Sequence, residues 1–293
     1  MDTNRELRIL SGKLSSLRKK DYIPSGLVDL AAKAHESFVT ATVKAKVDLP
    51  HPNELPTADQ LAQGAPLVPR NSFPFDAIQA SDLFFEHLDM LKKSHDSLTQ
   101  AAKEIEKAVR SNELTPDQAF EELLADRPGL FTDWAGRTPN APKSLAFVTQ
   151  CAMAPSIART GRDLAVFLPK DSIWKHGHCP VCGSLPHMAE LRDKEGYRYL
   201  SCSFCRHQYR VRRLSCPFCN ETDFEKLSFF TSDQEPGFRI DVCTSCSMYV
   251  KTSDFRSLDK VSLPVIDDLE SLVLDVLAAD KGYSRPTNSC WGF

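Results

Sequence analysis

Tightly paired cysteines constrain this chain more than any other feature of its sequence. Eight of its ten cysteines fall in four Cys-x-x-Cys motifs between Cys179 and Cys246. Two intervening residues allow a tight turn to aim both sulfurs at one ion, and amides of the same turn can donate to the thiolates. The motifs predict two four-cysteine metal sites. Site 1 comprises Cys179, Cys182, Cys202 and Cys205, and site 2 comprises Cys216, Cys219, Cys243 and Cys246.

A repeat in the sequence indicates how the motifs pair. The order motif, hairpin, motif occurs twice, with 19 residues between the motifs in the first copy and 23 in the second. Residues 188–192 and 197–200 predict the first hairpin, and residues 227–231 and 238–242 the second. The short linker 207–215 favours sequential pairing, with interleaved pairing as the open alternative. Gly183 and Asn220 directly follow the second cysteine of their motifs and tolerate the positive φ of a sharp turn. Arg206 and Ser247, at the same place in the other two motifs, lack this tolerance.

The spacing does not choose the metal. Four thiolates in a tetrahedron suit zinc and a single rubredoxin-type iron equally. A redox dithiol is the alternative for one motif, but four in one region favour metal. Nearby histidines (176, 178, 187 and 207) are weaker candidate ligands, because four cysteines per ion suffice. Arginine clusters are more often solvated faces, but one here could offset the negative charge of the sites or contact a partner. Its members are Arg206, Arg210, Arg212 and Arg213.

The rest of the chain predicts an α+β protein. Helical apolar spacing indicates an N-terminal all-α domain over residues 1–170, with helices at 27–43, 76–110, 115–124, 144–153 and 156–167 and a proline-rich connector at 48–74. Two tandem rubredoxin-like or zinc-ribbon modules follow, at residues 171–212 and 213–263. A C-terminal helix near 265–281, within the last segment 264–293, is expected to pack back on the helical part.

Composition narrows the classes of function. Hydrophobic residues make up 42% and the net charge is −3, as in ordinary globular proteins. Neither an N-terminal signal segment nor a membrane-length apolar run is evident, so we expect no membrane insertion. Nine basic residues balance nine acidic ones between Cys179 and Cys246, which argues against nucleic acid as a partner. No catalytic constellation is recognisable, so the sequence predicts a binding protein and not an enzyme.

The chain resembles the FdhE-type formate dehydrogenase accessory proteins. The resemblance rests on the Cys-Pro-Val-Cys-Gly-Ser run at 179–184, the later motifs in order, and the arginines before Cys216. It extends to Tyr249, Lys251 and the closing run 267–283, and the Gly-Ala-Pro-Leu-Val run at 64–68 is also similar to that family. One departure is Tyr209, where a tryptophan-type residue is expected.

This resemblance implies a cytoplasmic maturation factor that acts by binding the catalytic subunit of formate dehydrogenase. It also favours iron over zinc as the metal in both sites. The alternatives from other classes are a nucleic-acid-binding zinc-ribbon protein and a rubredoxin-like redox or electron-transfer protein.

Overall fold

The computed structural model describes residues 3–169, 172–289 and 291. The chain divides into two compact units, each built from segments that are distant in sequence. Unit 1 comprises Met1–Leu49, Arg70–Thr160 and Trp291–Phe293, and unit 2 comprises Pro50–Pro69 and Gly161–Cys290. The proline-rich connector therefore belongs to the same unit as the cysteines. The domain boundaries predicted at residues 170, 212 and 263 stay predictions.

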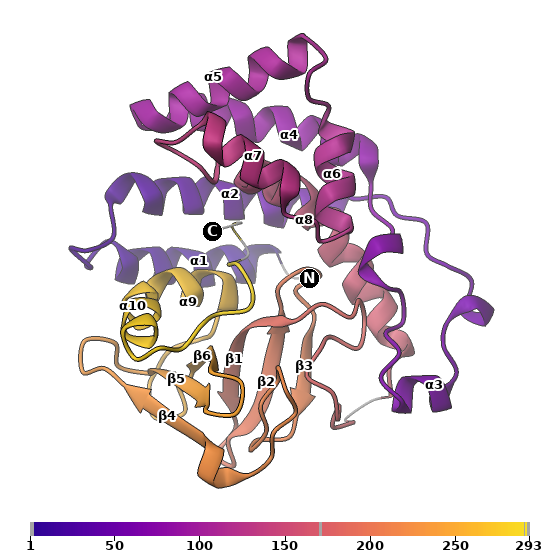
Figure 1. Cartoon of the computed structure of the whole chain (residues 1–293), viewed down its shortest axis with the longest axis vertical. Coiled ribbons are helices and arrows are strands. Elements are labelled where there is room, and N and C mark those ends of the chain that lie inside the picture. Colours follow the sequence, from indigo (N-terminus) through magenta and orange to yellow (C-terminus); the bar gives the residue numbers. More distant parts are fainter. Residues whose placement is uncertain (1–2, 170–171, 290, 292–293) are drawn as a thin grey trace. The chain divides into compact units, whose positions relative to one another are not determined.

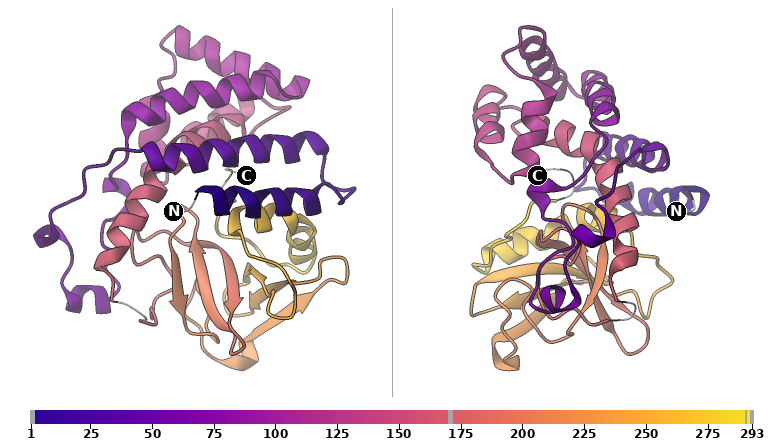
Figure 2. Two further views of the ribbon diagram at one scale, coloured as in Figure 1. Left: turned by 180° about the vertical axis from the view of Figure 1, so that it is seen from behind. Right: turned by 90° about the vertical axis from the view of Figure 1, so that its right-hand side faces the viewer.

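Unit 1 is built of helices. Its helices are α1 (Thr3–Leu17), α2 (Ser25–Lys44), α4 (Ala77–Lys92), α5 (Asp96–Arg110), α6 (Pro116–Leu124), α7 (Gly129–Arg137) and most of α8 (Ser144–Leu164). Helices α1 and α2 lie side by side (Figures 1 and 2). Phe38 and Val39 of α2 pack with Ala154 of α8 in a buried cluster that Leu7 of α1 borders. Thr115 caps α6 with Gln118 in a capping box, as the sequence predicts.

Three predicted helices of this region differ from the observed ones. The single helix expected over 76–110 is wrong, because α5 starts afresh after His95, whose ring accepts a hydrogen bond from the Ser97 amide. Proline does not interrupt α8, which runs through Pro155 and thus merges two predicted helices. Proline has no amide hydrogen, so α8 continues through Pro155 with one backbone hydrogen bond fewer. Helices α1 and α7 were not predicted.

Unit 2 is organised around one mixed sheet of six strands, ordered β3-β2-β1-β6-β5-β4 (Figure 1). The strands are β1 (Pro186–Arg192), β2 (Tyr197–Cys202), β3 (Gln208–Val211), β4 (Leu227–Thr231), β5 (Phe238–Cys243) and β6 (Met248–Ser253). Both predicted hairpins are confirmed, with β1 antiparallel to β2 and β4 antiparallel to β5. Strands β3 and β6, which follow the second motif of each repeat, were missed. The predicted linker 207–215 contains β3.

The two repeats are halves of one sheet. Strand β1 of the first repeat pairs in parallel with β6 of the second, and Ala189 lies opposite Thr252. The same backbone hydrogen bond closes the first motif of each repeat: the Cys179 amide donates to the Ser184 carbonyl and the Cys216 amide to the Glu221 carbonyl, both at 2.8 Å. Strands β1 and β6 therefore join the two repeats in one sheet.

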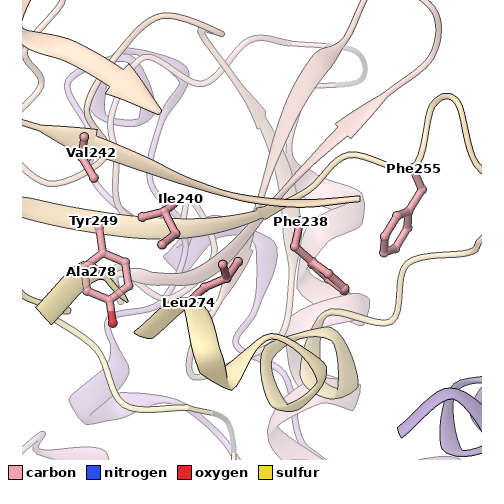
Figure 3. Packing of buried hydrophobic residues seen from close by; sticks show 7 residues of the cluster. All are labelled: Phe238, Ile240, Val242, Tyr249, Phe255, Leu274 and Ala278. Carbon is pink, nitrogen blue, oxygen red and sulfur yellow. The ribbon is translucent and has the colours of Figure 1, made fainter. Parts of the chain in front are cut away.

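Two terminal helices, α9 (Pro264–Glu270) and α10 (Leu272–Asp280), replace the one predicted. Lys251 accounts for the break, because its ammonium binds the Asp268 carbonyl at 2.7 Å and the Ser271 carbonyl at 3.4 Å. These helices pack back on the sheet of unit 2: α9 contacts β1 and β6, and α10 contacts β5. Figure 3 shows Leu274 and Ala278 of α10 beside Ile240 of β5 in a buried cluster. The α+β class with returning C-terminal helices is confirmed.

Short helical segments complete the molecule. They are α3 (Ala58–Ala62) and the 3-10 turns η1 (Pro52–Glu54), η2 (Arg70–Ser72), η3 (Ala165–Phe167) and η4 (Phe224–Lys226). Within the described residues, no helix is both long enough and apolar enough to cross a bilayer.

Candidate metal centres

Site 1 brings together four cysteines from the two motifs that flank the first hairpin. The sulfurs of Cys179 and Cys205 are 3.6 Å apart, and those of Cys182 and Cys202 are 3.4 Å apart. All four sulfurs lie within 4.8 Å of one another, and all four residues are buried. Sequential pairing of the motifs is therefore what the structure displays.

Site 2 repeats this arrangement around the second hairpin. The sulfurs of Cys216 and Cys246 are 3.6 Å apart, and those of Cys219 and Cys243 are 3.7 Å apart. Its burial differs from that of site 1: Cys216 and Cys243 are buried, Cys246 is partly buried and Cys219 is exposed.

Each motif ends in a residue with left-handed backbone conformation. Gly183 has φ of +79° and Asn220 of +59°, as expected, but Arg206 and Ser247 also adopt this conformation, at +59° and +55°. The second and fourth motifs thus make the same turn without the glycine or asparagine that favours it. Closing each loop around two sulfurs requires this turn, and the geometry prevails over the residue's own preference.

Amides of the same turns point at the sulfurs. The amides of Val181, Phe204 and Phe218 lie 3.4 Å from the sulfurs of Cys179, Cys202 and Cys216, respectively. Such donors stabilise a thiolate and fix its direction.

The sulfur geometry fits a four-coordinate metal ion. At a metal–sulfur distance of about 2.3 Å, the sulfurs of a tetrahedral site lie about 3.8 Å apart. The observed separations of 3.4–3.7 Å are close to that edge. Burial raises the pKa of the Cys179 and Cys205 thiols well above the ordinary value, so the thiolate form needs a cation nearby. A bound ion would supply that charge and hold the two turns of each site together.

The connector segment of unit 2 covers site 1. The Leu67 amide donates to the Pro180 carbonyl at 2.9 Å, and the Val68 amide donates to the Val181 carbonyl at 3.0 Å. Pro66 lies so close to Gly183 that an added β-carbon would be 3.3 Å from its ring. Sequence reasoning did not assign this role to residues 64–68, although their likeness to the FdhE-type family was a signal.

The histidines near the motifs take other partners. Ring nitrogens of His176 and His178 lie 3.1 and 2.8 Å from the carbonyls of Ala62 and Gly64, so both tie the connector to the first motif. His207 stacks on Tyr209, and His187 lies 3.7 Å from Asp268. In the part of the chain that the structure describes, the two clusters with metal-ligand geometry consist of cysteines alone.

The four candidate arginines are not equivalent. Arg210 stacks over the Tyr197 ring at 3.8 Å, and Arg213 donates to the Glu195 carbonyl at 2.8 Å. Arg206 forms the turn that closes the second motif. Arg212 and Arg213 are exposed. A partner-binding role for any of the four remains a proposal.

A buried charge network beneath β6 was missed at the sequence level. Lys251 is fully buried, and its ammonium lies 2.7 Å from Asp268 and 2.6 Å from Asp275. Arg285 also reaches Asp268, at 2.8 Å. The resemblance noted for Lys251 and for the run 267–283 falls on this network, whose observed contacts tie α9 and α10 to the sheet.

Comparisons with known proteins identify the cysteine-bearing region. Residues 178–213 match the family model described as "FdhE, central domain", and residues 200–290 match "FdhE, C-terminal domain". Residues 178–290 belong to the FdhE family. The matched stretch contains all eight cysteines of the two sites.

Curated FdhE proteins are similar over the same part of the chain. A "Protein FdhE homolog" of Haemophilus influenzae (strain PittEE) is 39% identical over 111 residues, which are 37% of this chain and 36% of the relative. One from Aquifex aeolicus is 31% identical over 123 residues, 41% of this chain and 43% of the relative. "Protein FdhE" of Escherichia coli (strain K12 / DH10B) is 34% identical over 111 residues, 37% of this chain and 35% of the relative. The matches thus span less than half of each relative.

A solved structure shares the fold of the whole chain. The crystal structure of the FdhE protein from Pseudomonas aeruginosa superposes with a TM-score of 0.70 and covers 99% of this chain and 96% of its own. Sequence identity is 18%, so this likeness speaks for the fold alone. The fold shared with that protein therefore extends over both the helical unit and the unit that carries the cysteines of this chain.

Proposed function

We propose that this chain is a metal-binding accessory protein for formate dehydrogenase, and that it acts by binding the catalytic subunit of that enzyme. The observation that carries the proposal is the placement of two four-sulfur clusters inside the region that matches the FdhE family. The eight cysteines are the metal ligands in this proposal, with iron favoured and zinc as the alternative.

The geometry supports a binding role. A small sheet held by two ions presents a preorganised surface, and preorganisation lowers the entropy lost when a partner binds. Exposed Arg212 and Arg213, next to site 2, are candidate contacts for the partner. The proposal places this action in the cytoplasm and assigns no reaction to the chain itself.

Two measurements test the proposal. Elemental analysis of anaerobically purified protein is expected to give two metal ions per chain and to identify the metal. Co-purification of tagged protein with the formate dehydrogenase catalytic subunit, from anaerobically grown cells, is expected to show a specific complex. Absence of that complex, with two ions bound, would contradict the accessory role while leaving the metal sites intact.

The redox alternative predicts a different result. A thiolate–iron site absorbs visible light and bleaches on reduction, whereas zinc in both sites gives a colourless protein. A colourless protein with two zinc ions would exclude electron transfer by these sites.

A further inference from the structure

The two clusters differ in how much of their surface solvent can reach. All four cysteines of site 1 are buried, whereas in site 2 Cys219 is exposed and Cys246 is partly buried. Ligand geometry does not account for this difference, because the sulfur separations of the two sites are alike.

Site 1 is enclosed by chain segments of its own unit. Two backbone hydrogen bonds fasten Leu67 and Val68 to the first motif, as described above. On another side the last turns of α8 reach the second motif, where a β-carbon added to Gly161 would lie 3.4 Å from the Cys205 sulfur. Removing a sulfur of site 1 from its ion therefore requires movement of the connector, of α8 or of the turn itself.

Site 2 is open from two directions. Cys219 lies at the surface, in a turn that Asn220, also exposed, completes. A hollow of about 140 Å³ also has Cys216 and Cys243 in its wall. Leu214 and Phe229, which are 63% and 59% exposed, line the same hollow. A small molecule can thus approach the cluster directly at Cys219 or through this hollow.

We propose that the two metal sites have separate roles: site 1 retains its ion as a structural centre, and site 2 exchanges ligands with small soft molecules such as thiols. This inference rests on metal binding in the proposed function. In the exchange, the metal–sulfur bond to Cys219 breaks and a bond to the incoming donor forms. The freed Cys219 thiolate takes up the proton that the incoming thiol loses on binding, and the metal keeps its oxidation state. Exposure makes Cys219 the first ligand to leave, because its displacement uncovers no buried sulfur.

Metal transfer to a coloured chelator tests this inference. The full chain, loaded anaerobically with two equivalents of Zn²⁺, is mixed with 4-(2-pyridylazo)resorcinol, and release is followed by absorbance. We expect two phases of one equivalent each, the first faster by about tenfold or more, as for local opening of unequal free energy. Release in one phase would overturn the proposal. Binding of fewer than two ions at loading would instead contradict the metal sites of the proposed function.

Cysteine alkylation assigns the phases without any substitution. The zinc-loaded chain is treated with N-ethylmaleimide, and modified peptides are quantified over time by mass spectrometry. We expect Cys219 and Cys246 to react first and the four cysteines of site 1 to react last. Equal rates at both sites, or earlier reaction at site 1, would overturn the proposal.

A matched pair of variants gives an independent reading. Cys219→Ser is expected to abolish the fast phase and retain the slow one, and Cys182→Ser is expected to do the reverse. Loss of the slow phase in Cys219→Ser, with the fast phase retained, would also contradict the assignment. Should Cys182→Ser fail to fold, the alkylation order of the unmodified chain still decides.

Discussion

Gly161 of α8 lies directly against Cys205 of site 1. A β-carbon at Gly161 would be 3.0 Å from the β-carbon of Cys205, 3.1 Å from its carbonyl oxygen and 3.4 Å from its sulfur. Any side chain at this position therefore displaces either the helix or a metal-binding turn. This close approach explains why residue 161 is glycine, because the helical backbone at this position does not itself require glycine.

Replacing Gly161 is expected to weaken site 1. We expect Gly161→Val to destabilise unit 2 by about 1–3 kcal/mol, the usual cost of forcing atoms into a packed site. Thermal unfolding and zinc release measure the effect. Gly136→Ala in α7 is the matched control, because its added β-carbon meets no atom within 4 Å. An unchanged slow phase of metal release in Gly161→Val would contradict the role of this contact.

Gly177 makes a still closer approach, to the carbonyl of Pro217 in the third motif. An added β-carbon would lie 1.7 Å from the carbonyl oxygen of Pro217, so the two loops must separate. Gly177→Ala is expected to cost about 3 kcal/mol or more, at the severe end for one substitution. Denaturant unfolding measures this cost. The control Gly12→Ala in α1 adds a β-carbon in open space and is expected to be neutral or stabilising.

Asp268→Asn is expected to destabilise the packing of α9 against the sheet. The change leaves Lys251 and Arg285 without their shared carboxylate, and breaking one side of a buried ion pair costs about 3–5 kcal/mol. Chemical denaturation measures this cost. The exposed pair of Arg18 and Asp29 supplies the control, since Asp29→Asn is expected to have little effect. Equal stability of the two variants would show that the buried network contributes nothing.

The same carboxylate predicts a pH dependence. Burial favours its protonated form, but the charges of Lys251 and Arg285 outweigh burial and hold the pKa of Asp268 well below its ordinary value. Asp268 therefore stabilises the fold above pH of about 4, where the unfolded carboxyl is ionised. This stabilisation is lost as the pH falls toward the folded-state pKa. The Asp268→Asn variant is expected to show a smaller loss of stability below pH 4 than the unmodified chain.

Removal of the site 1 ligands is expected to disorder the first repeat and spare the helices of unit 1. The variant replaces Cys179, Cys182, Cys202 and Cys205 together by serine, which leaves no thiolate for the ion. Limited proteolysis should then cut between residues 180 and 212, whereas residues 77–160 stay protected by their own core. An intact first hairpin in this variant, with one ion per chain, would contradict its dependence on site 1.

The cysteine sites could be predicted in detail because their signal is local. Spacing within a motif determines the turn, and the distance between motifs leaves room for one hairpin. Both hairpins and the grouping of the sulfurs follow from these local rules. The left-handed turns at Arg206 and Ser247 could not be predicted, because neither residue prefers that conformation and only closure around the cluster demands it.

Longer-range features escaped the sequence for a physical reason. Nothing near Leu67 indicates that its amide donates to Pro180, more than 100 residues away. The break between α9 and α10 likewise depends on Lys251, which belongs to a strand. The helix boundary at His95 had a local signal, a capping side chain, which the continuous apolar stripe concealed.

The parallel pairing of β1 with β6 has a consequence for biosynthesis. Strand β1 (Pro186–Arg192) leaves the ribosome unpaired on one side, because its neighbour β6 (Met248–Ser253) is synthesised later, with the second repeat. During that interval β1 is an open edge, and such edges recruit strands from other chains. A nascent chain stalled between the repeats would therefore be prone to aggregate, and prompt delivery of the second repeat protects the first.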